Sequence, residues 1–235
     1  MGGINAQDFI DELIFCLNKK DTVKAKALLQ FASDANVDVQ LQIRTLAELA
    51  KGPEDVVFPL LEYLTKLEIS NTQVQESLYD LLLDKAYGNT NLVTEYITSN
   101  EKNTRIQFIR AAGDLVLEET IPALIQVVKD ETDPEIITPA INSLAVFGKP
   151  EHIDFFSSFS THSDTGITKA AIFAIGAVSN PQATDTLLSF LCEDETINKL
   201  VVQAIAEKQD LYNLEKLTNL LSSPVTIIRD TAICL

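Results

Sequence analysis

A pair of adjacent large apolar residues at positions i and i+1, followed by a third apolar residue at i+4, recurs along this chain at intervals of 30 to 32 residues, and the last copy is weaker. The clearest copy is Leu124, Ile125 and Val128. Positions with this spacing lie on one face of an α-helix, so each copy predicts the buried stripe of one helix. The seven copies begin at Leu28, Leu60, Leu92, Leu124, Phe155, Leu187 and Leu217.

A second apolar marker precedes each stripe by about 15 residues, which leaves room for one helix and a short turn. These markers are Ile14, Leu46, Leu78, Ile109, Ile141, Ile172 and Val202. Each repeat is therefore predicted to be a helical hairpin of about 31 residues, and neighbouring hairpins bury each other's apolar faces. We predict an all-α fold, a right-handed α-α superhelix of about seven hairpins plus a partial eighth, in one domain over residues 1–235.

Cap and turn residues lie where the hairpin repeat predicts that helices begin and end. Short carboxylates accept the free amide hydrogens at a helix start, and the predicted caps are Asp21, Asp38, Asp133 and Asp164, with Glu195 at the matching place in the seventh repeat. Corners inside the hairpins are predicted at 52–53, 88–89, 148–150 and 179–181, where Gly, Asn or Pro ends a helix. The eighth unit starts at Pro224 without a polar closing repeat, so we expect this to be the N-terminal part of a longer protein.

The charge balance restricts the class of partner. The 235 residues include 34 acidic and 18 basic side chains, a net charge of −16. Such a surface repels nucleic-acid phosphates and anionic lipids, so we expect neither nucleic acid nor a membrane as a partner. The cysteines Cys16, Cys192 and Cys234 show neither a disulfide framework nor CxxC spacing, which favours a reducing cytoplasm.

The sequence contains no recognisable catalytic or metal-binding motif. GxSxG, Walker, GxGxxG and HExxH patterns are all absent. The two histidines, His152 and His162, lie ten residues apart, and we interpret them as surface residues beside loops. We therefore expect no enzyme activity, no metal and no cofactor.

Two segments carry a family resemblance, IPALIQVVKDETDPEIITPAINSLAVFG at 121–148 and GITKAAIFAIGAVSNPQATDTLLSFLCED at 166–194. Their order of helix, Gly or Pro turn, acidic cap and Ala-rich helix resembles the short HEAT-like repeats of the type found in phycobilisome lyases. HEAT repeats often have Arg just after the acidic cap, and Arg105 and Arg229 are the nearest matches here. This chain departs from that pattern at Ile136, Ile137, Ile167 and Thr168. Tetratricopeptide and ankyrin repeats fit less well, because their Trp-Gly-Tyr and TPLH signatures are missing.

Acidic residues gather in two loops between hairpins. The first cluster is Asp130, Glu131, Asp133 and Glu135, and the second is Glu193, Asp194 and Glu195. One interpretation is that they cap helices and offset helix dipoles. The other is an acidic ridge that faces a basic partner or a divalent cation, although no EF-hand spacing supports the cation.

The predicted function is a non-catalytic protein–protein interaction scaffold or docking domain. Stacked hairpins form a concave face lined by the second helix of each pair, and a protein or peptide segment binds there. The acidic surface favours a basic partner. The predicted protein-binding residues are the small or polar Gln126, Lys129, Ser157, Ser160 and Ser189, the aromatic Phe190, and the acidic Glu193, Asp194 and Glu195. The resemblance implies an alternative, a lyase-like or chaperone-type subunit of a cofactor-attaching enzyme, which predicts tetrapyrrole binding in the groove.

Overall fold

The computed structural model describes residues 5–206 and 214–234, and over these ranges the chain is entirely helical, with fifteen α-helices, two short 3-10 helices and no strand. The predicted all-α fold of repeated helical hairpins is confirmed. Contacts within the chain group it into two compact units, unit 1 over Met1–Ala111 and unit 2 over Ala112–Leu235. The prediction of a single repeat domain stays a prediction.

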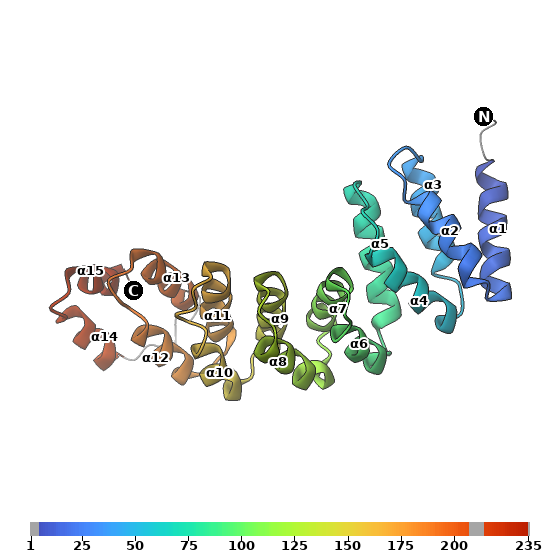
Figure 1. Cartoon of the computed structure of the whole chain (residues 1–235). Coiled ribbons are helices and arrows are strands. Elements are labelled where there is room, and N and C mark those ends of the chain that lie inside the picture. Colours follow the sequence, from blue (N-terminus) through green and yellow to red (C-terminus); the bar gives the residue numbers. More distant parts are fainter. Residues whose placement is uncertain (1–4, 207–213, 235) are drawn as a thin grey trace. The chain divides into compact units, whose positions relative to one another are not determined.

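Unit 1 consists of hairpins that pack in chain order (Figure 1). Its helices are α1 (Ala6–Lys19), α2 (Thr22–Ala32), α3 (Val39–Leu49), α4 (Glu54–Thr65), α5 (Thr72–Ala86), α6 (Thr90–Ile97) and the greater part of α7 (Lys102–Asp114). Helix α1 contacts α3, and α3 contacts α5, so the odd-numbered helices form one layer. Helix α2 contacts α4 in the second layer, which is the arrangement of an α-hairpin repeat.

Unit 2 repeats the same arrangement. Its elements are η1 (Glu118–Thr120), α8 (Ile121–Asp130), α9 (Pro134–Val146), η2 (Pro150–His152), α10 (Ile153–Ser157), α11 (Thr165–Ala177), α12 (Pro181–Ser189), α13 (Glu195–Ala206), α14 (Leu214–Leu221) and α15 (Thr226–Cys234). The odd layer runs α9, α11, α13, α15, and the even layer includes the contacts of α10 with α12 and of α12 with α14. None of the described helices is long and apolar enough to cross a bilayer.

Side-chain caps set most helix starts as the sequence predicts. Asp21, Asp38, Asp133 and Asp164 each accept a hydrogen bond from a backbone amide in the first turn of the helix that follows. The prediction for the seventh repeat was wrong by one residue. Asp194 is the cap there, because its Oδ1 accepts from Thr196 N at 2.8 Å, and Glu195 is the first helical residue.

In six of the odd-numbered helices the fourth residue is polar, and its side chain forms a hydrogen bond with the chain just before the helix. Its side chain donates to a turn carbonyl five to eight residues upstream. The six residues are Gln42 in α3, Gln75 in α5, Arg105 in α7, Thr168 in α11, Asn198 in α13 and Arg229 in α15. In α9 the same place holds Ile137, which is buried. These side chains satisfy carbonyls that the bend of the chain leaves without helical partners.

The predicted stripes form the core only in part. Their second members are buried at Leu29, Leu61, Val93, Phe156 and Leu188, whereas Ile125 is half-buried. The last stripe is not buried, since Leu221 is 44% exposed, in keeping with its weak pattern. The small residues Ala171 and Gly176 of α11 lie in the odd layer, and a Cβ on Gly176 would approach Ala204 Cβ of α13 to 3.0 Å.

Candidate functional site

Of the predicted binding residues, Gln126 and Lys129 lie on α8, Ser157 on α10 and Ser189 on α12, whereas the others lie in the turns after α10 and α12 or, for Glu195, at the start of α13. Gln126 and Lys129 of α8 and Ser189 of α12 are exposed, as predicted. Gln126 Nε2 donates to Asp130 Oδ2 at 2.5 Å one turn further along the helix. Ser189 Oγ donates to Thr186 O at 2.6 Å, so the hydroxyl serves its own helix and keeps its lone pairs for a partner.

Two residues predicted for the same exposed row behave differently. Ser160 is buried, with 6% of its surface exposed, so the prediction that it is an exposed helical residue was wrong. The reason is that α10 ends at Ser157, and the turn after it folds inward, with Ser160 Oγ donating to Ser157 O at 2.8 Å. Ser157 itself is half-buried and donates to Ile153 O.

The phenylalanines of repeats five and six are less buried than their stripe positions suggest. Only Phe156 is fully buried, and Phe155, Phe159 and Phe190 are half-exposed. Phe155 lies between Phe156 and Phe159, with ring centroids 5.8 and 5.4 Å apart. Because α10 and α12 contact each other, Phe155 of α10, Phe159 in the turn after it and Phe190 just after α12 lie in one layer of the unit. The expectation that Phe190 reaches the surface is confirmed.

The second acidic cluster combines structural and free charges. Asp194 caps α13, and Glu195 forms an ion pair with Lys199 at 2.7 Å. Glu193 is exposed and has neither role among the described residues. In the first cluster, Asp133 caps α9 and Glu131 accepts from the amides of Thr132 and Asp133. The capping interpretation is therefore confirmed for one residue of each cluster, and the ridge interpretation stays a prediction.

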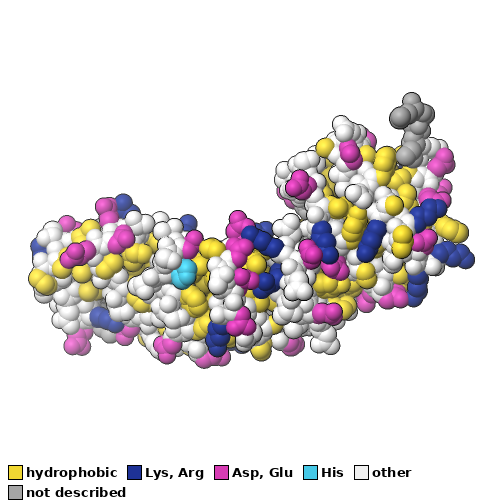
Figure 2. All heavy atoms as spheres, viewed as in Figure 1, with side chains coloured by type: hydrophobic (Ala, Val, Ile, Leu, Met, Phe, Trp, Pro, Cys, Tyr) yellow, Lys and Arg dark blue, Asp and Glu magenta, His cyan; other side chains and the backbone are white. Residues whose placement is uncertain are grey.

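Negative charge is concentrated in unit 2. This unit has 18 acidic and 7 basic residues, whereas unit 1 has 16 acidic and 11 basic residues. Of the basic side chains of unit 2, Lys149 is paired with Glu118 at 3.0 Å and Lys199 with Glu195. Figure 2 shows the carboxylates scattered among basic and apolar side chains on the face drawn. A basic partner would therefore meet attraction over much of unit 2.

In unit 1, polar side chains pair between even-numbered helices, and the sequence pattern did not predict these pairs. Tyr63 of α4 donates its hydroxyl to Gln30 Oε1 of α2 at 3.0 Å, and Lys26 Nζ lies 5.5 Å from the Tyr63 ring centroid. These contacts join α2 to α4 and fix the Tyr63 ring. A repeat pattern of apolar residues contains no signal for such polar pairs, because they depend on which outward positions of two helices meet.

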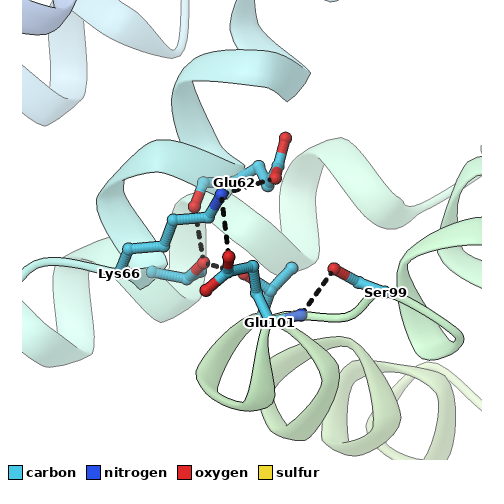
Figure 3. Close-up of polar contacts among 6 residues, drawn as sticks. Glu62, Lys66, Ser99 and Glu101 are labelled. Atoms are coloured by element: carbon cyan, nitrogen blue, oxygen red, sulfur yellow. Dashed lines mark hydrogen bonds and ion pairs between the residues drawn. The ribbon is translucent and has the colours of Figure 1, made fainter.

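A second polar network links α4 to the start of α7 (Figure 3). Lys66 Nζ lies 2.8 Å from Glu62 Oε1 and 4.0 Å from Glu101 Oε1, and Ser99 Oγ accepts from Glu101 N at 3.2 Å. The hydrogen bond to Glu62, and after it the nearby carboxylate charges, raise the pKa of Lys66 above its ordinary value. The network is exposed, so it orders side chains more than it stabilises the fold.

An aromatic column lies beneath this network. Tyr96 of α6 stacks on Phe108 with ring centroids 4.6 Å apart and on Phe58 at 6.4 Å. Burial, and secondarily the charge of Glu62, raise the pKa of the Tyr96 phenol. Thr65 and Thr104 share a buried hydrogen bond of 2.7 Å nearby in the same unit. This part of unit 1 contains stacked aromatic rings and a buried hydrogen bond.

Three buried polar atoms of unit 2 have no hydrogen-bond partner in the part of the chain described, namely His152 Nδ1, Thr184 Oγ1 and Asp185 Oδ1. His152 is half-buried and meets Phe156 edge-on, so the prediction of a surface histidine holds only in part for His152. His162 is exposed, and its Nδ1 accepts from Asp164 N at 3.0 Å. Within residues 5–206 and 214–234, no three His, Cys, Asp or Glu side chains gather as a metal site.

The two cysteines whose side chains are described lie where small apolar residues are expected. Cys16 is buried and Cys192 is half-buried, and both are free thiols. Burial, followed by the charge of Glu12, raises the pKa of the Cys16 thiol. The side chain of Cys234 lies outside the described residues.

Comparison with known proteins places the chain in no family. No protein-family description matches the sequence, and no curated protein sequence matches it. Among solved structures, YibA of Escherichia coli is similar over 98% of this chain and 94% of its own, at 16% identity and a TM-score of 0.48. Two engineered proteins are similar at 17% and 18% identity with TM-scores of 0.46 and 0.43, over 97% and 96% of this chain and 72% and 94% of theirs. The fold assignment therefore rests on the helices and contacts of this chain.

Proposed function

We propose that this chain is a non-catalytic, HEAT-like protein-binding scaffold, and that a basic amphipathic segment of a partner binds across α8, α10 and α12 of unit 2. The observation that carries the proposal is the surplus of carboxylates on a unit whose even-numbered helices expose small polar residues beside half-exposed phenylalanines. The absence of recognised catalytic motifs is consistent with a scaffold and adds no support of its own.

The physical basis for the basic partner is long-range attraction. Lysine or arginine side chains on a partner segment would be steered to unit 2, which raises the association rate and weakens with salt. Lys216, a further basic residue of the unit, donates to Asp185 O at 2.6 Å, which directs its charge toward the protein.

Affinity requires an apolar anchor as well as charge. Aromatic residues dominate binding energy at the centre of interfaces, and small neighbours allow a partner helix to approach closely. Partly buried rings are supplied by Phe155 of α10 and by Phe159 and Phe190, which follow α10 and α12, and small neighbours by Ser157 and Ser189 at the ends of the same two helices. An amphipathic helix with a basic polar face fits both requirements.

A pair of designed probes tests the proposal directly. Two fluorescent helical peptides share one apolar face and carry either lysine or glutamate on the polar face. We expect anisotropy titrations to show binding of the lysine peptide and at least about tenfold weaker binding of the glutamate peptide, with the preference reduced at high salt. Equal binding of the two peptides would reject charge as a basis of recognition, and no binding of either would reject the site.

A charge-reversal variant locates the contact. Glu193→Lys with Glu195→Lys leaves the capping residue Asp194 in place, so α13 should keep its start. We expect weaker binding of the lysine peptide and a smaller dependence on salt. The matched control is Glu76→Lys with Asp80→Lys on α5, two exposed residues of unit 1 with the same change in charge. If the control weakens binding as much as the variant, the effect comes from net charge and the site assignment fails.

Two further proposals concern the cellular compartment and the alternative function. We place the protein in a reducing, cytoplasmic compartment, because Cys16 and Cys192 are free and separated along the chain. The lyase-like or chaperone-type alternative stays a prediction, tested by a change in visible absorbance when a tetrapyrrole is added to the protein.

A further inference from the structure

A small neutral cavity lies between two inter-hairpin turns of unit 1. Its volume is about 200 Å³, and it is lined by Ser33, Ala35, Val39, Gln42, Ser70 and Asn71. The first four belong to the α2–α3 turn and the start of α3, and the last two form the end of the α4–α5 turn. At roughly 30 Å³ per liquid water, the volume corresponds to about seven waters, or one medium-sized side chain.

Gln42 gives the cavity a fixed acceptor. The side chain is 4% exposed, and its Nε2 donates to Asp34 O at 2.9 Å and to Val37 O at 3.1 Å. Both amide hydrogens are thereby used, so the group that Gln42 can still offer to a ligand is the Oε1 carbonyl oxygen. A buried amide that is anchored through its donors loses little side-chain entropy on binding.

Residues of the α4–α5 turn add possible donors to the lining. Asn71 Oδ1 accepts from Val74 N at 3.2 Å as the cap of α5, which leaves its Nδ2 hydrogens for other partners. Ser70 is exposed and carries a hydroxyl that can donate or accept. Ser33 Oγ donates to Leu29 O at 2.8 Å and keeps its lone pairs. The cavity therefore presents acceptors at Gln42 and Ser33 and donors at Asn71 and Ser70.

From this arrangement we infer that the cavity is a binding site for a primary carboxamide, the head group of an asparagine or glutamine side chain. A carboxamide combines an N–H donor with a C=O acceptor in one plane, which suits a neutral lining that contains both acceptors and donors. None of the six lining residues is charged, so a carboxylate would lose its hydration without gaining a cationic partner. The inference is independent of the peptide surface proposed for unit 2.

Matched amide and acid probes test the chemistry. The full chain, labelled with ¹⁵N, is titrated with N-acetyl-glutamine N-methylamide or with the glutamate analogue of the same shape. We expect low-millimolar binding of the amide, with shifts at the backbone amides of Ala35, Ser70 and Asn71, and at least about tenfold weaker binding of the acid. Equal shifts from both probes, or shifts confined to other regions, would overturn the inference.

Two variants and two ligand sources complete the test. Asn71→Asp keeps the oxygen that caps α5 but removes the Nδ2 donor, and Ser70→Ala removes an exposed hydroxyl, so both should fold normally and bind the amide probe at least about fivefold more weakly. The control is Gln73→Ala, an exposed residue of the same helix that does not line the cavity. Tighter binding of free glutamine than of a Gly-Gly-Gln-Gly-Gly peptide identifies a free amino acid as the ligand, and the reverse order identifies a side chain of a bound segment. Unchanged binding in Asn71→Asp contradicts the inference.

Discussion

Replacing Asn198 by alanine should destabilise the end of unit 2 by about 2–3 kcal/mol. Asn198 is 1% exposed, its Oδ1 accepts from Cys192 N at 3.0 Å, and its Nδ2 donates to Cys192 O at 2.9 Å. A buried backbone group left without a partner costs about 1–3 kcal/mol, and we take the lower end for each group because Cys192 is half-buried and water can reach it. The lost contacts of the buried side chain add up to about 1 kcal/mol.

The measurement is the midpoint of urea unfolding followed by circular dichroism, together with amide hydrogen exchange of α12 and α13. For a chain of this size the change corresponds to a fall in Tm of about 4–12 °C. Repeat proteins can unfold in parts, so exchange should quicken first in 181–206. Gln203→Ala is the control, because Gln203 is exposed on the same helix and should change stability by less than about 0.5 kcal/mol. If Asn198→Ala and Gln203→Ala unfold at the same urea concentration, the turn does not depend on this side chain and the reasoning is refuted.

Three further changes follow from other contacts. Thr184→Val should raise the stability of the protein by about 1 kcal/mol in urea unfolding, because it replaces a fully buried hydroxyl that has no partner by a methyl group; a loss of stability would show that a bound water satisfies the hydroxyl. Gly113→Ala should lower stability by about 1–3 kcal/mol, since its Cβ would lie 2.9 Å from Ser143 Cα, and an unchanged melting temperature would contradict this. The Cys16 thiol should react with a disulfide reagent far more slowly than Cys192 in the native protein. Because burial raises its pKa, the unfolded thiol ionises first as the pH rises, so stability should fall above about pH 8.5 and this fall should be smaller in Cys16→Ala.

The period of the apolar residues was sufficient to predict the hairpins, because burial between stacked helices requires the same faces in every repeat. Hairpin corners at 52–53 and 88–89 and caps at Asp38 and Asp164 were predicted from turn chemistry that acts locally. The errors fall where the repeat is irregular. Helix α10 has only five residues, and the turn after it buries Ser160, which a regular helix would have exposed.

The candidate surfaces were less predictable than the fold. Exposed positions on one helix follow from its period, so Gln126, Lys129 and Ser189 were placed correctly. The contacts that order unit 1, such as Tyr63 with Gln30, join residues 33 positions apart on different helices. Their formation depends on the offset between stacked hairpins, and an apolar period does not specify that offset closely enough to pair polar side chains.

The fourth position of the odd-numbered helices shows that different side chains can make the same hydrogen bond in successive repeats. HEAT-like repeats often carry arginine just after the acidic cap, and the bend of the chain at this place leaves a turn carbonyl in need of a donor. Arg105 and Arg229 supply it here, but Gln42, Thr168 and Asn198 supply it equally well. The constraint is therefore a donor of sufficient reach and not a particular residue type. Different side chains at this place supply the donor in six helices, and α9 has the buried Ile137 there, so the hairpin does not depend on one residue type at this position.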